Sequence, residues 1–277
     1  MRSNSPIVSL DLESRPQTLT VVRGMLSGVA ELLTIDPELL DDLKTTVSEA
    51  CNNVVLHAYG GAPGPMGVRL FVDERRIRVT VDDSGVGLPA AASERAEGIG
   101  MSVIRALADE VSLLPGPEGG TRVQMDFAAQ RDGRTLLERP TVAGPDEAWA
   151  REGTHEIVVS LSPVTLLAGV LGRLARTLAA GAHFSLDRFS DVYLVTDTLA
   201  AHAVSAAAGL RIQARLEAAE RRLELVVGPF RSGTSERLRS PRADRAPSPL
   251  ALLSDELSVE PDGDDELLHV VVVDHRR

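Results

Sequence analysis

The stretch EACNNVVLHAY, residues 49–59, decides the fold of the first half of this chain. It closes a segment with the 3.6-residue apolar period of an amphipathic helix, which Asp36 should cap and Pro37 should begin. The apolar positions of this helix, which should face a sheet, are Leu39, Leu43, Val47, Ala50 and Val54. Glu49 and Asn53 lie together at the edge of that stripe, where half-buried side chains can line a cleft. Alone, such a pair is more typical of a solvated helix surface.

The bulk composition excludes several classes of protein. The chain has 277 residues, 43% hydrophobic and 25% charged, as in a globular protein. Its formal net charge of −11 argues against direct nucleic-acid binding, which relies on basic patches. The single cysteine, Cys51, allows no internal disulfide and should be a small buried residue. Because there is neither a signal-peptide core nor a run of about 18 uncharged apolar residues, we expect a cytoplasmic protein that does not enter a membrane.

A second segment, VTVDDSGVGLP (79–89), reads as a strand that runs into a turn. Asp83 stands where the strand ends, and a carboxylate there can accept a hydrogen bond from an exocyclic amine such as that of adenine. Gly85 and Gly87 allow backbone conformations and a close ligand approach that a side chain would block. Alone, the segment also fits an ordinary Asp/Gly turn.

Two further segments carry glycines. GIG (98–100) opens the helix MSVIRALADEV (101–111), and glycines before a helix free backbone N–H groups for phosphate oxygens. The dinucleotide fingerprint does not apply, because a polar stretch rather than a strand precedes GIG. GGT (119–121) forms a turn before a strand, and the Thr121 hydroxyl could support Asp83.

In this order and spacing, the four segments resemble the N, G1, G2 and G3 boxes of the GHKL superfamily of ATP-binding domains. EACNNVVLHAY, the short lid after VTVDDSGVGLP, and GMSVIRALADEV followed by GGTRVQM look most like the anti-sigma-factor serine/threonine kinases of bacteria. The resemblance covers residues 7–128. It implies an α+β fold, the two-layer sandwich of the histidine-kinase-like ATPases, with helices on one face of a mostly antiparallel sheet.

The resemblance also implies roles for single residues. Glu49 would be the general base for the attacking hydroxyl, Asn53 would ligate Mg²⁺, and Asp83 would bind the adenine amine. The remaining residues implied to contact the ATP are Gly85, Gly87, Gly98, Gly100 and Thr121. Phosphoryl transfer requires mainly positioning, charge neutralisation by Mg²⁺ and one oriented acceptor of the proton, and these residue types can supply them.

The implied function is ATP-dependent phosphorylation of an anti-anti-sigma (STAS-type) protein, with sequestration of a sigma factor. A non-catalytic, ATP-gated binding module stays open as the alternative, because the lid (88–97) has Arg95 as its sole cation. Glu49 favours the kinase, since pure binding needs no base. A two-component histidine kinase is disfavoured because the chain lacks a dimerising helical hairpin with a phosphoacceptor histidine.

The chain also reads as an internal duplication. At an offset of 146, ERRIRVTV (74–81) matches ERRLELVV, ALADEVSL (106–113) matches LLSDELSV, and TRVQM (121–125) matches LLHVV. At an offset of 149, the region 34–55 matches 183–204. Each half is predicted to run strand, helix, helix, hairpin, helix and two strands, with first-half helices near 17–33, 37–58 and 99–109.

These repeats predict three parts: an ATP-binding kinase domain (1–130), a linker (131–153) and a degenerate copy (154–277). In the second half every chemical position is replaced while the apolar scaffold persists. The residues that fall on the site positions there are Thr198, His202, Pro229, Asp244, Ala246 and Leu267. We therefore expect a pseudo-ATPase, and a fused copy of this kind could supply a dimer contact within one chain.

Overall fold

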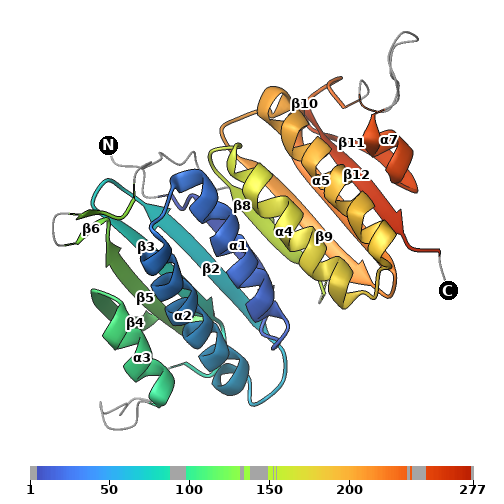
Figure 1. Cartoon of the computed structure of the whole chain (residues 1–277). Coiled ribbons are helices and arrows are strands. Elements are labelled where there is room, and N and C mark those ends of the chain that lie inside the picture. The colour runs from blue at the N-terminus through green and yellow to red at the C-terminus, as the bar shows by residue number, and fades with distance from the viewer. Residues whose placement is uncertain are drawn as a thin grey trace. The chain divides into compact units, whose positions relative to one another are not determined.

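The computed structural model describes residues 5–87, 98–131, 134–137, 149–151, 153, 155–235, 238 and 248–275. The chain divides into two compact units, Met1–Val142 and Ala143–Arg277, which are described separately (Figure 1). No helix formed by the described residues combines the length and apolar character that a membrane span requires.

The first unit is a five-stranded sheet with helices packed on it. Its elements are β1 (Val8–Glu13), α1 (Thr18–Leu33), α2 (Pro37–Asn53), a π-helix (Val54–Ala58), β2 (Pro65–Val72), β3 (Arg76–Asp83), α3 (Ile99–Leu107), β4 (Glu110–Pro115), a 3₁₀ turn (Pro117–Gly119) and β5 (Thr121–Ala128). The strand order is β1-β2-β3-β5-β4, and every pair within the unit is antiparallel. Figure 1 shows α1 and α2 side by side over one face of this sheet. The predicted α+β architecture is confirmed.

The helix α2 forms as its sequence predicts, apart from its last turn. The Asp36 carboxylate accepts a hydrogen bond from the Glu38 N–H at 3.0 Å, and Pro37 takes the first helical position. All five predicted core positions are buried, and so is Cys51. The predicted α-helix over 37–58 is wrong for its end, because α2 stops at Asn53 and a π-helix continues to Ala58. A π turn inserts one extra residue, which an apolar period cannot reveal over so short a stretch.

Part of the stretch predicted as a linker is folded. A short hairpin of β6 (Gln130–Arg131) and β7 (Arg134–Thr135) follows β5. Leu136 and Leu137 are buried on the first unit, where the Asp36 N–H donates to Leu136 O at 2.9 Å. The stretch reads as a linker in the sequence because it is polar overall, although it contains these two leucines.

The second unit has the same order of elements. They are β8 (Ile157–Leu161), α4 (Leu166–Gly181), α5 (Leu186–Ala206), β9 (Ile212–Ala219), β10 (Arg222–Arg231), α7 (Pro249–Leu253), β11 (Glu256–Asp262) and β12 (Asp265–Val273). The strand order is β8-β9-β10-β12-β11, again antiparallel throughout. The connectivity of this sheet therefore repeats that of the first unit strand by strand.

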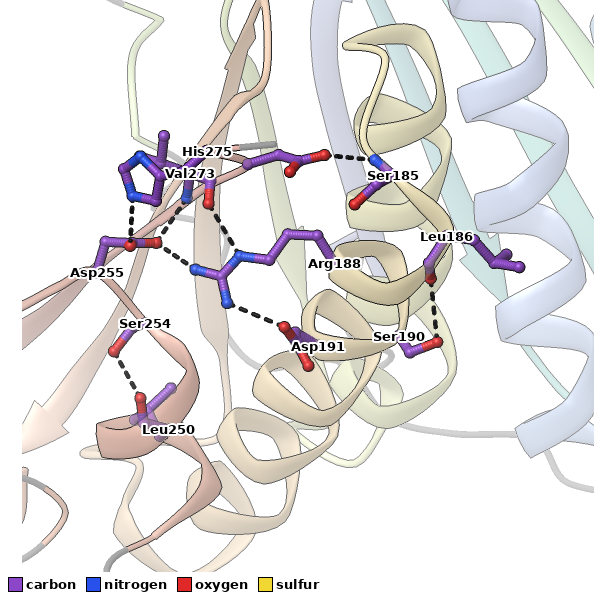
Figure 2. Close-up of polar contacts among 11 residues, drawn as sticks. Ser185, Leu186, Arg188, Ser190, Asp191, Leu250, Ser254, Asp255, Val273 and His275 are labelled. Carbon is purple, nitrogen blue, oxygen red and sulfur yellow. Dashed lines mark hydrogen bonds and ion pairs between the residues drawn. The ribbon is translucent and has the colours of Figure 1, made fainter. Parts of the chain in front are cut away.

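One corner is built alike in both units. In the first unit the Ala128 N–H donates to Asp109 Oδ2 at 2.8 Å, and in the second the Val273 N–H donates to Asp255 Oδ2 at 2.7 Å. The second unit adds Arg188 of α5, which pairs with Asp255 and donates to the Val273 carbonyl at 2.9 Å (Figure 2). The aspartate thus joins the end of a helix to the last strand of each sheet.

Candidate functional site

Three predicted site residues, Glu49, Asn53 and Gly100, lie together although they come from two helices. Glu49 and Asn53 occupy successive turns of α2 and are half-buried, and Gly100 is in the first turn of α3. A Cβ atom on Gly100 would stand 2.8 Å from Glu49 Oε2 and 3.3 Å from Asn53 Oδ1. The glycine therefore lets the start of α3 come directly against a carboxylate and a carboxamide, so this pair is not simply a solvated helix surface.

The start of α3 is open to a ligand. Gly98 is exposed and precedes the helix with extended backbone angles, φ −69° and ψ 174°. A Cβ atom at this position would meet no atom within 4 Å. The first N–H groups of an α-helix have no intrahelical acceptor, and the positive end of the helix dipole favours an anion there. This is the chemistry that phosphate oxygens require, and it adjoins Glu49 and Asn53.

Asp83 is the last residue of β3 and is buried, with 6% of its surface exposed. Its Oδ1 accepts hydrogen bonds from the Gly85 N–H at 2.8 Å and from the Thr121 N–H at 3.2 Å. A buried carboxylate needs such donors to replace its hydration. Both donors belong to predicted site segments, and Oδ2 takes part in neither bond.

Two glycines permit backbone contacts around Asp83 that other residues would prevent. Gly87 has φ +70°, and its Cβ would stand 2.4 Å from Gly119 O. A Cβ atom on Gly120 would stand 1.9 Å from Asp83 O. The turn after β3 and the turn before β5 are therefore in backbone contact, which brings together two segments that are distant in sequence.

The structure adds one residue that sequence reasoning left out of the site. Tyr59 directly follows the π-helix, and its hydroxyl accepts a hydrogen bond from the Ser84 N–H at 2.8 Å. The signal in the sequence was weak, namely an aromatic residue at the end of EACNNVVLHAY. Tyr59 directly follows the π turn, and π turns often mark functional sites.

Several predicted positions lie outside the described residues. They include the lid (88–97) with Arg95, and in the second half Asp244 and Ala246. The site described here therefore consists of α2 and its π turn, the end of β3, the start of α3 and the start of β5.

The register of the second sheet corrects one pairing read from the sequence. Leu225 of β10 pairs with Val270 of β12, as Val79 of β3 pairs with Met125 of β5. The last strand is thus displaced by one residue relative to the match between TRVQM and LLHVV. The valines at 270–273 make both registers compatible with the sequence. The difference matters, because a shift of one residue moves every side chain of a strand to the opposite face of the sheet.

Glu266 rather than Leu267 consequently stands where the first unit has Thr121. Glu266 is buried, and its carboxylate accepts hydrogen bonds from the Gly233 N–H at 2.9 Å and the Ser235 N–H at 2.5 Å. Burial raises the pKa of this carboxyl, but these bonds outweigh burial and hold it below its ordinary value. These N–H groups of the turn after β10 therefore already donate to a carboxylate of the chain itself.

Other positions of the second unit that correspond to site residues of the first also hold different groups. Pro229 replaces the aspartate of β3 and offers no carboxylate. The neighbouring Phe230 is fully buried, and its ring centroid lies 5.4 Å from that of His202. Thr198, at the position of the glutamate, donates its hydroxyl to Leu194 O at 2.7 Å. Among the described residues, the second unit lacks the acidic and amide groups of the first site at these positions.

Comparison with known proteins agrees with this geometry. Residues 12–127 match the family described as the histidine kinase-like ATPase domain. The serine-protein kinase RsbW of Bacillus pumilus is 38% identical over 88 residues, covering 31% of this chain and 54% of that protein. The RsbW of Listeria monocytogenes serotype 4a is 32% identical over 122 residues, covering 38% and 78%. The anti-sigma F factor of Caldanaerobacter subterraneus subsp. tengcongensis is 28% identical over 130 residues, covering 43% and 91%.

The family match lies within the first unit, and the chain spans about half the length of the Bacillus relatives, 54% in each case. The Listeria protein is covered over more than two thirds of its length. The family match over residues 12–127 includes α2, β3, α3 and β5. The chain therefore belongs to the histidine-kinase-like ATPase family, within the group of the anti-sigma-factor kinases.

Proposed function

We propose that this chain is an ATP-dependent anti-sigma-factor serine/threonine kinase, which phosphorylates an anti-anti-sigma partner and otherwise sequesters a sigma factor. The observation that carries the proposal is the contact of Glu49 and Asn53 with the first turn of α3 at Gly100. A base, an amide oxygen and a phosphate-binding helix start adjoin one another there. The names of the relatives support the same activity.

Glu49 is the residue proposed to carry the chemistry. Its Oε2 takes the proton of the attacking serine or threonine hydroxyl of the partner. The hydroxyl oxygen then bonds to the γ-phosphorus, the bond from that phosphorus to the β–γ bridging oxygen breaks, and ADP leaves with the electron pair. Because Glu49 is half-buried against α3, its carboxylate would lie beside phosphates bound at the start of that helix.

Asn53 fits the proposed Mg²⁺. The cation prefers hard oxygen ligands and keeps several waters, so one protein amide oxygen together with phosphate oxygens is a suitable donor set. The described residues contain no group of three or more His, Cys, Asp or Glu side chains that could hold a metal alone. Bound there, Mg²⁺ would neutralise charge on the phosphates. Asn53 Oδ1, one turn from Glu49, is the proposed ligand.

The adenine end is proposed to lie at Asp83. Its Oδ2 would accept a hydrogen bond from the exocyclic amine, while Oδ1 accepts from the Gly85 and Thr121 N–H groups. Gly87 would pack against the base, and Thr121 would support the contact through water. Gly98 and Gly100 would present backbone N–H groups to the phosphates.

The second unit is proposed to be a degenerate copy that arose by duplication and binds no ATP. The identical connectivity of the two sheets supports this origin. The proposed domain limits are 1–130 and 154–277, and a contact between the halves is proposed to replace the dimer contact of a single-domain kinase. We further propose that the chain works in the cytoplasm, where ATP and sigma factors are found.

The variant Glu49→Ala tests the assignment, with the exposed Glu38→Gln of the same helix as its control. Partners are first captured with and without ATP and then assayed for phosphoserine and phosphothreonine. We expect Glu49→Ala to bind ATP while partner phosphorylation is lost, and Glu38→Gln to behave as the wild type. Persistent phosphorylation in Glu49→Ala would show that another group is the base. A wild type that binds ATP and captures a partner without phosphorylating it would instead be an ATP-gated binding module.

A further inference from the structure

Tyr59 connects the end of the α2 helical segment to the strand-end turn that carries Asp83. Its hydroxyl donates to Pro65 O at 2.5 Å and accepts from the Ser84 N–H at 2.8 Å. Ser84 is the residue between Asp83 and Gly85. One hydroxyl therefore holds both the first residue of β2 and the backbone directly after β3, using its donor and its acceptor capacity at once.

The same turn is held by the residue before Tyr59. The Val86 N–H donates to Ala58 O at 3.0 Å, and a Cβ atom on Gly85 would stand 2.2 Å from that oxygen. The π turn thus places two consecutive residues, Ala58 and Tyr59, against the segment 84–86. On its other side, Asp83 is held by the Thr121 N–H. Asp83 therefore lies between the segment 84–86, which Ala58 and Tyr59 hold, and the start of β5.

The second unit shows the arrangement without the hydroxyl. Ala208 corresponds to Tyr59 at the sequence offset of 149, and its N–H donates at 3.1 Å to the carbonyl of Pro229, which corresponds to Asp83. This contact joins two backbone groups, and Pro229 has no carboxylate to orient. At this position a phenol is therefore present in the unit that has the aspartate and absent from the unit that lacks it.

We propose that Tyr59 is a positioning residue that orients Asp83 for the exocyclic amine of adenine, and this rests on the proposed ATP site. It acts through Ser84 and touches no reacting atom. Loss of the hydroxyl frees the backbone after β3, so the carboxylate no longer lies where the amine must donate. Only nucleotides that bear this amine should then lose affinity, because the phosphates are proposed to bind elsewhere, at the start of α3.

The test compares ATP with inosine triphosphate, which has the same phosphates but a carbonyl oxygen in place of the amine. The Tyr59→Phe variant keeps the ring that packs beside Gly64 and removes both hydrogen bonds. We expect wild type to prefer ATP strongly, and Tyr59→Phe to bind ATP about tenfold more weakly, which is the loss of about one net hydrogen bond. Its affinity for inosine triphosphate should not change.

Tyr193→Phe is the matched control, because Tyr193 is the other tyrosine of the chain and is 48% exposed on α5. Both dissociation constants should be those of the wild type. If Tyr59→Phe weakens both nucleotides equally, or neither, Tyr59 does not act through Asp83 and the inference is wrong. If the wild type binds neither nucleotide, the proposed function itself fails, and this inference fails with it.

Discussion

The backbone of Gly120 lies against the backbone of Asp83, so closely that a Cβ atom on Gly120 would stand 1.9 Å from Asp83 O. This contact fixes the turn before β5 on the end of β3. It also brings the Thr121 N–H within 3.2 Å of Asp83 Oδ1. Glycine is required at position 120 because any side chain would clash with the backbone of Asp83, and not because of an unusual φ angle.

We therefore expect Gly120→Ala to destabilise the fold by about 1–3 kcal/mol, as overpacking does, and to weaken ATP binding. The obstacle is backbone, which cannot move aside as a side-chain end can. Thermal unfolding and ATP titration measure the two effects. Gly181→Ala is the control, because a Cβ there meets nothing within 4 Å and alanine suits the end of a helix. Equal melting temperatures for the two variants would contradict the contact.

Gly100→Ala should separate phosphoryl transfer from folding. The added methyl group would meet Glu49 Oε2 at 2.8 Å and Asn53 Oδ1 at 3.3 Å, and both are the ends of flexible side chains that can turn away. The melting temperature should hardly change, while partner phosphorylation falls at least tenfold because Glu49 is displaced. The exposed Ser102→Ala on the same helix should keep full activity. Unimpaired transfer in Gly100→Ala would show that Glu49 need not lie against α3.

Each chain should bind one ATP. Isothermal titration of the wild type should give a stoichiometry near one, and Asp83→Asn should abolish binding rather than reduce the wild-type signal by half. Restoring a carboxylate in the second unit with Pro229→Asp should not create a site, because the rings of Phe230 and His202 pack together beside it and Glu266 already accepts from the nearby N–H groups. A second binding event in any of these proteins would refute a single site.

Acid should destabilise the second unit through two carboxylates. Burial raises the pKa of both Asp255 and Glu266, but hydrogen bonds and, at Asp255, the charge of Arg188 outweigh it, so both folded pKa values lie below the ordinary ones. Their stabilisation is thus fully present above about pH 4–5, where the unfolded carboxyls are ionised, and is lost as pH falls through the lowered folded pKa values.

Urea unfolding between pH 7 and pH 3 checks this. Asp255→Asn and Glu266→Gln should lower stability at pH 7 and show a shallower loss toward pH 3 than the wild type. The exposed Glu220→Gln serves as the control and should follow the wild-type curve. Parallel curves for all four proteins would mean that neither carboxylate is linked to folding.

Cys51 should not react with thiol reagents in the folded protein. It is fully buried in α2, and burial raises the pKa of its thiol to about 12. At pH 8 the reactive thiolate is therefore scarce as well as inaccessible. A colorimetric thiol assay should find no reactive group in the native chain and one per chain in denaturant. Rapid native labelling would place Cys51 outside the core.

The elements with strong periodic patterns could be predicted from the sequence. The helix α2, its Asp36 cap and its buried stripe follow from local preferences and from burial of the apolar face. The position of Asp83 at a strand end follows from the turn chemistry of the residues after it. Short-range patterns of this kind are written into neighbouring residues, so no tertiary information is needed to read them.

The register of β12 and the π turn before Tyr59 could not be predicted in this way. A valine-rich strand satisfies two registers equally, and only pairing with β10 selects the one that puts Glu266 against the turn after β10. The π turn adds a single residue, which tertiary contacts from the turn after β3 stabilise. Both errors were one residue in size, and each changed the direction in which a side chain points.

The sequence by itself determined which chemical groups this protein has: a glutamate and an asparagine one helical turn apart, an aspartate at a strand end, and glycines before a helix and a strand. Only the tertiary structure decided that these groups meet. Glu49 and Asn53 reach Gly100 because α2 and α3 pack together, and Asp83 meets Thr121 because β3 and β5 are neighbours in the sheet. Such contacts depend on long-range packing, in which the burial of apolar side chains across the whole unit fixes backbone positions that no local pattern records.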